Sequence, residues 1–134
     1  MLETAALLVV ALLFGGALLY SAGFAAFLFS ALPPETAGPT IRRAFPHFYL
    51  FTAGTAALAA LLLWPSDPLS AGLMAAVAVT TVPTRQRLMP AINAATDAGA
   101  RRRFHTLHGL SVAITLAHIL LAGVVLARFL EGAP

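Results

Sequence analysis

The sequence predicts an all-α integral membrane protein, a bundle of four transmembrane helices with both termini on the non-cytoplasmic side. Hydrophobic residues make up 60% of the 134 residues, and charged residues only 10%. The stretches 4–34, 44–66, 68–84 and 104–127 carry no charge. A hydrocarbon core about 30 Å thick needs roughly 20 apolar helical residues, and lipid forces each crossing to satisfy its own backbone. Three stretches exceed that length, and 68–84 falls just short of it.

The arginines predict the orientation of these helices in the membrane. Seven of them would lie on one side, namely Arg42, Arg43, Arg85, Arg87, Arg101, Arg102 and Arg103. Only Arg128 marks the other side. By the positive-inside rule the side with seven arginines is cytoplasmic. Their positions at the ends of apolar stretches indicate contact with anionic lipid and not with nucleic acid. The lipid bilayer is the expected partner. Alanine and arginine usage without lysine suits a GC-rich bacterial genome, and the expected location is the bacterial inner membrane.

The first helix is expected over about residues 4–32. It is too long for a signal peptide and has no basic leading segment. Pro33 and Pro34 should end it, because proline lacks the amide proton and clashes with the preceding turn. The segment 35–44, with Gly38 and Pro39, then predicts a short linker or partial helix along the inner interface.

The second and third helices are expected at about residues 45–64 and 69–88. Pro46 suits the first turn of the second helix, and Trp64 marks the outer boundary. The turn 65–68 is so short that the two helices must pack as an antiparallel hairpin. Pro83 predicts a kink near the end of the third helix.

The fourth helix is expected at about residues 98–130, with Thr96 or Asp97 capping its start. All four helices would form a single membrane domain over residues 1–134. Small residues on the first two helices suit close helix contact. They are Gly15, Gly16, Ala22, Gly23 and Ala26 on the first helix, and Ala53, Gly54, Ala57 and Ala60 on the second.

A polar stripe on the fourth helix is the most informative chemical pattern. His108, Ser111, Thr115 and His118 are spaced three, four and three residues apart, which places them on one helix face. One interpretation is that they hydrogen-bond within and between helices. The other is that they line a polar cavity, as in a small transporter, with His118 near mid-membrane and facing a partner.

A second pattern gathers histidines at the cytoplasmic end. His47 would lie at the start of the second helix, and His105 and His108 at the start of the fourth. Three imidazoles suffice for an open zinc-type site, and two on different helices suffice for a b-type haem. The chain has no cysteine, which excludes covalent haem attachment and thiolate ligands. Ordinary interfacial histidines are the competing interpretation.

Three segments carry a resemblance to a known family. They are Phe-Pro-His-Phe-Tyr at 45–49, Pro83 together with 85–89, and Arg-Phe-His-Thr-Leu-His-Gly-Leu-Ser at 103–111. The chain resembles the transmembrane protein 205-like family, a small four-helix membrane domain of uncharacterised function, over roughly residues 10–130. The resemblance implies the four-crossing arrangement and gives functional weight to Pro46, His108, Gly109 and Ser111. It implies no reaction.

The sequence offers no nucleophile with an evident base and no paired carboxylates, so hydrolase chemistry is unsupported. The leading hypothesis is a non-enzymatic accessory or scaffold subunit of a larger inner-membrane assembly. Its partners would be other membrane subunits or a second copy of the chain. A redox protein using His47, His105 and His108, and a small transporter lined by the polar stripe, are the alternatives.

Overall fold

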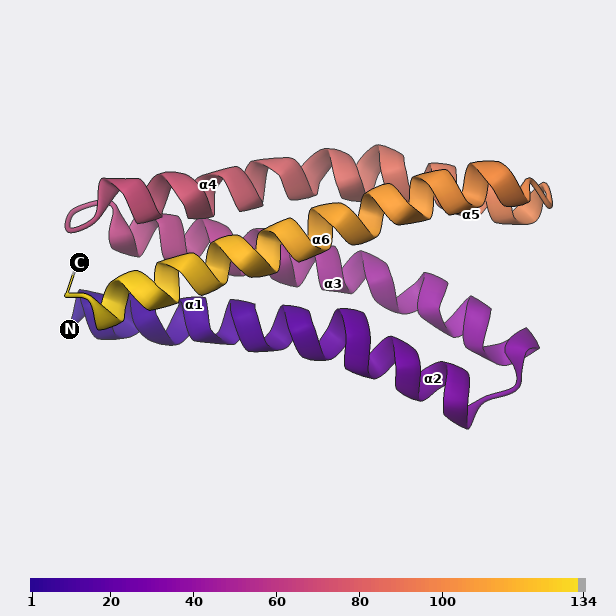
Figure 1. The fold of residues 1–134 in the computed structure, drawn as a ribbon, viewed down its shortest axis with the longest axis horizontal. Coiled ribbons are helices and arrows are strands. Elements are labelled where there is room, and N and C mark those ends of the chain that lie inside the picture. The colour runs from indigo at the N-terminus through magenta and orange to yellow at the C-terminus, as the bar shows by residue number, and fades with distance from the viewer. Residues whose placement is uncertain (133–134) are drawn as a thin grey trace.

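The computed structural model describes residues 1–132, and the chain runs back and forth as helical rods joined by tight turns (Figure 1). The first rod contains α1 (Leu2–Leu18), the π-helical segment η1 (Leu19–Phe24) and α2 (Ala25–Ala31). The second is α3 (Pro34–Leu63). The third contains α4 (Pro68–Pro83), the π-helical segment η2 (Thr84–Leu88) and α5 (Met89–Asp97). The fourth is α6 (Arg101–Leu130).

Three helices are long and apolar enough to cross a membrane: Leu2–Ala31, Pro34–Leu63 and Arg101–Leu130. Their outward surfaces are apolar, with Leu8, Leu61 and Leu120 at least 65% exposed. A helix that is hydrophobic around its whole circumference needs an apolar environment. The protein is therefore a helical membrane protein.

The start of the second helix differs from the sequence prediction. Residues 35–44, expected as a linker, are helical, and α3 begins at Pro34 instead of Phe45. Proline fits the first position of a helix because its missing amide proton has no intrahelical acceptor there. Pro39 and Pro46 consequently lie inside α3, and Pro46 does not begin a helix. Gly38 suits the position before Pro39, because a side chain there would crowd the proline ring in the helical conformation.

The end of the third helix also differs. The α-helical part of this rod changes to the π-helix η2 directly after Pro83, and the rod then continues to Asp97, nine residues beyond the expected end at Leu88. Asp97 is thus the last residue of α5 and does not cap the fourth helix, whose N-cap residue Ala100 has no side-chain bond. Gly99, at a φ of 63°, forms the turn that the prediction placed inside the helix.

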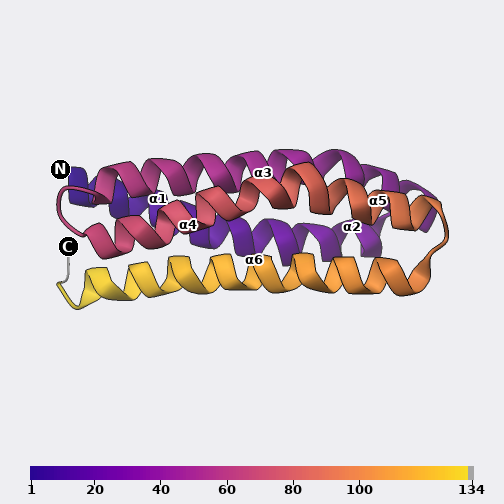
Figure 2. The same cartoon turned by 90° about the horizontal axis from the view of Figure 1, so that it is seen from above.

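The buried core lies at the end of the bundle where the two termini and the α3–α4 turn meet (Figures 1 and 2). Small and medium side chains from α1, α3, α4 and α6 fill it: Ala6, Val10, Leu13, Ala56, Ala59, Leu63, Ala71, Met74, Val77, Ala122 and Val125. A second cluster of Ala17, Phe48, Tyr49 and Ile119 continues it toward the middle. At the opposite end the α2–α3 turn and the α5–α6 turn lie apart (Figure 1).

The small residues expected at helix contacts divide into two groups. A Cβ atom on Gly16 would lie 2.6 Å from the Phe51 ring, so the absence of a side chain allows α1 and α3 to approach closely. A Cβ atom on Gly15 or Gly54 would meet no neighbour within 4 Å, and both glycines are exposed. Only part of the predicted small-residue face therefore serves contact inside the bundle.

Candidate functional site

The end of the bundle with the α2–α3 and α5–α6 turns, here called the open end, contains a cavity of about 500 Å³. Side chains from η1, α2, α3, α5 and α6 line it, so every rod contributes. Its apolar lining includes Phe29, Ile41, Phe45, Met89, Ile92, Val112 and Leu116. Its polar lining consists of Ser21, Arg42, Tyr49, Asn93, Thr96, His108, Ser111 and Thr115. An apolar cavity with a few placed polar groups is the usual form of a small-molecule site.

One π-helical segment, η1, lines this cavity, and the other, η2, ends next to a lining residue. Ser21 and Ala22 belong to η1 and line it, and Met89 follows η2 directly. A π-helical turn interrupts the regular ladder of backbone bonds, changes the direction in which side chains point, and is frequent at functional sites. Irregular backbone thus forms part of the cavity wall in the first rod.

A buried hydrogen bond closes the deep side of the cavity. The hydroxyl oxygens of Tyr49 on α3 and Ser111 on α6 are 3.1 Å apart, and Tyr49 is only 4% exposed. Next to this bond, the Tyr20 ring of η1 stacks on Phe48 with centroids 5.3 Å apart. The Tyr20 hydroxyl donates to the Ala44 carbonyl at 3.0 Å. Aromatic packing and these bonds therefore hold α3 against both η1 and α6.

Arg42 lies at the polar rim of the cavity. Its Nη2 atom is 2.7 Å from Oδ1 of Asp97 and 3.4 Å from the Asn93 carbonyl oxygen. These contacts tie α3 to the end of α5. The side chains remain accessible, with Arg42 35% and Asp97 65% exposed. Sequence reasoning treated Arg42 as a topology signal and missed this pair, because the helical form of residues 35–44 was not anticipated.

The predicted polar stripe divides between two environments. His108, Ser111 and Thr115 line the cavity. His108 is exposed, and its ring stacks on Phe104 with centroids 5.2 Å apart. His118 lies outside the described cavity lining; it is buried, and its Nε2 atom is 2.8 Å from the Thr80 hydroxyl of α4. The stripe thus lines a cavity along its first half and makes an interhelical bond at its end.

The histidines expected to hold a metal are not brought together. Within residues 1–132, no three His, Asp or Glu side chains are placed to hold a metal ion. His47 and His105 are exposed and do not line the cavity, whereas His108 does. His47 was expected at the start of a helix, whereas the structure places it inside α3, which begins at Pro34.

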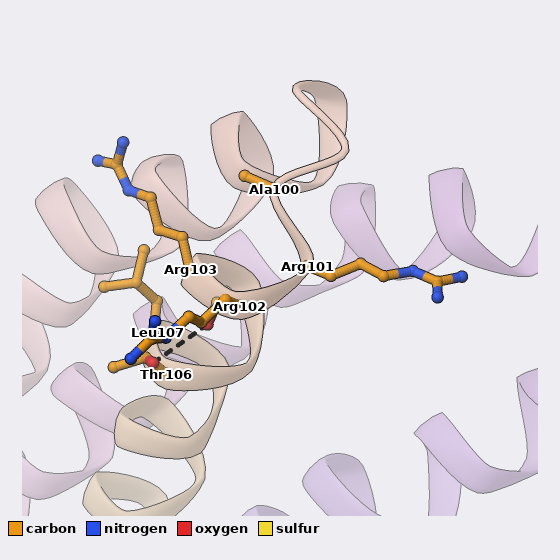
Figure 3. A pocket seen from close by; sticks show the side chains of 6 residues that line it. All are labelled: Ala100, Arg101, Arg102, Arg103, Thr106 and Leu107. Atoms are coloured by element: carbon orange, nitrogen blue, oxygen red, sulfur yellow. Dashed lines mark hydrogen bonds between the residues drawn. The ribbon is translucent and has the colours of Figure 1, made fainter.

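The remaining arginines do not converge on one site. Arg101, Arg102 and Arg103 border a shallow pocket of about 590 Å³ at the start of α6, where the side chains of Arg101 and Arg103 point in opposite directions (Figure 3). Nε of Arg85 donates to the Pro46 carbonyl at 3.4 Å. Two further arginines, Arg43 and Arg87, are on the surface. Surface arginines of this kind are suited to contact with anionic lipid headgroups.

Sequence reasoning missed a polar cluster at the other end of the bundle, where the two termini and the α3–α4 turn meet. Nε and Nη2 of Arg128 lie 3.1 and 3.0 Å from the carboxylate oxygens of Asp67, and Nε also donates to Ser70 at 2.9 Å. Asp67 caps α4 by accepting from the Ser70 amide at 3.2 Å, and the Ser70 hydroxyl donates to the same carboxylate. Burial raises the pKa of Asp67, but the bonds from Ser70 and Arg128 outweigh it and hold the pKa below its usual value. An aspartate before Pro68 with Ser70 three residues later is the signal that indicates the cap.

Comparison with protein families matches residues 8–101 to a domain of unknown function, DUF4149. The match covers the first three rods and ends where α6 begins. No curated protein and no solved structure matches the chain. Since the matched segment is well over half of the 134 residues, this helical membrane protein belongs to the DUF4149 family.

Proposed function

We propose that this chain is a single four-crossing membrane domain that holds a small amphiphilic molecule in the cavity at its open end. The cavity carries this proposal. It takes lining residues from all four rods, its wall is mainly apolar, and its polar groups include the partly exposed Arg42 and the buried Tyr49–Ser111 pair. A volume of about 500 Å³ lies in the range of sites for small ligands.

The fourth crossing is α4 with η2. Its apolar part is short, but Arg85 lies 17 residues after Pro68, about 26 Å along the helix. That distance nearly spans the hydrocarbon core, and the long arginine side chain extends to the headgroups. The arginine-rich end then faces the cytoplasm, both termini face outward, and α5 and the cavity rim lie at the inner interface. A bacterial inner membrane and kinship with the transmembrane protein 205-like family belong to the same proposal.

The test uses purified protein in nanodiscs of zwitterionic lipid and a neutral probe, a fluorescently labelled monoacylglycerol. Ala25 lines the cavity and Ala26 does not, although the two are neighbours on α2. Ala25→Phe should fill the cavity and abolish saturable binding. Ala26→Phe adds the same ring to an exposed site and should leave binding unchanged. Equal binding by both variants, or none by the wild type, would contradict the proposal.

A second candidate function is the accessory or scaffold subunit of a membrane assembly. Gly15, Gly54 and Gly72 support it, because each leaves open space where a side chain would be and all three are exposed. Outward small residues let another helix approach closely in lipid. Mild extraction and native mass spectrometry test this idea; a monomer that is isolated with no other subunit and no second copy argues against it.

The transport and haem alternatives remain predictions with narrower support. A transport path along the stripe must pass from the cavity at Thr115 to His118. The His118 ring is hydrogen-bonded to the Thr80 hydroxyl of α4. His118→Ala should then abolish flux while leaving the fold intact. A b-type haem would need two axial histidines from different helices, and an absorption spectrum of the purified protein tests for it.

A further inference from the structure

We infer that the molecule held in the cavity is a single-chain amphiphile with an anionic headgroup, which Arg42 binds in exchange for Asp97. The inference rests on the proposed binding function and assigns its ligand class. A fatty acid and a lysophospholipid share this chemistry, since each has one acyl chain and one acidic head.

The charge of the lining supports an anion. Among the described lining residues, Arg42 alone carries a permanent charge, and His108 adds an imidazole donor. No aspartate or glutamate belongs to the described lining. Arg42 is paired with Asp97, which lies outside the lining, so the wall of the cavity itself carries a cation and no acid. Next to a low-dielectric region a cation attracts an acidic group more strongly than it does in water. The cavity therefore favours anionic over cationic amphiphiles.

The Arg42–Asp97 contact has the form of an exchangeable ion pair. Asp97 is 65% exposed, and its Oδ1 atom lies 2.7 Å from Nη2 of Arg42. Exposed pairs of this kind contribute little stability. A ligand carboxylate or phosphate offers two oxygens to the planar guanidinium, which is the stronger geometry. We therefore expect Asp97 to neutralise Arg42 while the cavity is empty. When the ligand binds, its acidic headgroup should replace Asp97 as the partner of Arg42.

The apolar wall of the cavity would contact the acyl chain of the ligand. Phe29 and Phe45 line the cavity from the α2–α3 side, and Val112 and Leu116 line it from α6. The α6 lining runs from Phe104 to Leu116, about 18 Å along the helix axis. That length suits one extended acyl chain, whereas two chains and a glycerol backbone exceed the volume of about 500 Å³. The polar rim at Arg42 and Asn93 would meet the headgroup.

Equilibrium binding in zwitterionic nanodiscs tests the inference with labelled palmitate, labelled lysophosphatidate and the neutral monoacylglycerol probe. Arg42→Gln should weaken palmitate binding about tenfold or more, because a charge-assisted hydrogen bond is lost. The neutral probe should lose much less affinity than palmitate in that variant, because its headgroup makes no charge-assisted bond. Arg43→Gln is the matched control: it removes the same charge from the next residue, which lies outside the cavity lining, and should change nothing.

Asp97→Asn separates exchange from a structural role. It should tighten palmitate binding several-fold, since the competing carboxylate is gone. If Asp97→Asn weakens palmitate as Arg42→Gln does, or if Arg42→Gln binds palmitate normally, the inference is overturned. Binding of the neutral probe that Ala25→Phe blocks, with no preference for either acid, would leave the proposed function standing and refute the ligand class alone. Palmitate without lysophosphatidate binding, or the reverse, identifies which acidic head the site takes.

Discussion

Replacing Arg128 with methionine should destabilise the bundle by about 2 kcal/mol. Arg128 makes two bonds to Asp67 and one to Ser70, and Asp67 is only 4% exposed. Removing one partner of a buried ion pair costs about 3–5 kcal/mol, whereas an exposed pair is worth about 0–1 kcal/mol. Arg128 is 26% exposed, and Asp67 keeps its bonds from Ser70, so the expected cost lies between these limits.

The assay is equilibrium unfolding in mixed micelles as the fraction of denaturing detergent rises. Trp64, the single tryptophan, lies three residues before Asp67 and reports on this end of the bundle. Arg102→Met removes an exposed arginine from the other end of α6 and serves as the matched control. Adding Asp67→Asn to Arg128→Met should recover part of the loss, because the uncompensated carboxylate disappears. A loss below about 0.5 kcal/mol, or strictly additive effects in the double variant, would refute this reasoning.

Two further predictions use the same unfolding assay. The folded-state pKa of Asp67 is below its unfolded value, so its contribution to the free energy of unfolding is complete above the unfolded pKa of about 4 and is lost as pH falls through the folded value. The protein should therefore lose stability on acidification. Asp67→Asn should lack that part of the loss. Gly16→Leu should cost about 1–3 kcal/mol by forcing a side chain against the Phe51 ring, and Gly15→Leu, which meets open space, should cost little; equal stability of the two variants would contradict the close α1–α3 packing at Gly16.

The helical membrane character was predictable from the sequence because it depends on long uncharged stretches, which composition reveals directly. The ends of the helices were less predictable. Pro39 and Pro46 indicate a helix boundary when only the local chain is considered, since each removes a backbone donor. In the structure α3 passes through both prolines, and Arg85 donates to the Pro46 carbonyl from another rod. Contacts of this kind with another rod leave no local sequence signal, so the local pattern around the prolines did not show that the helix continues.

The site was predictable only in part for the same reason. The spacing of His108, Ser111 and Thr115 predicts one shared helix face, and all three residues line the cavity. Their partners depend on which helices adjoin that face, and spacing within one helix does not determine this. Spacing therefore did not identify Tyr49 as the hydrogen-bond partner of Ser111. The pairing of Arg42 with Asp97 depends on the longer α3 and the longer third rod, and local helix propensity did not indicate either extension.

The pair of Asp67 and Arg128 has a consequence for how the chain is made. The two residues are 61 positions apart, so Asp67 is synthesised long before its arginine. Until α6 arrives, the hairpin of α3 and α4 carries a carboxylate with only Ser70 to hold it. Closure of the bundle is thereby coupled to insertion of its last long helix. A chain interrupted before Arg128 would carry this buried acid without its cationic partner.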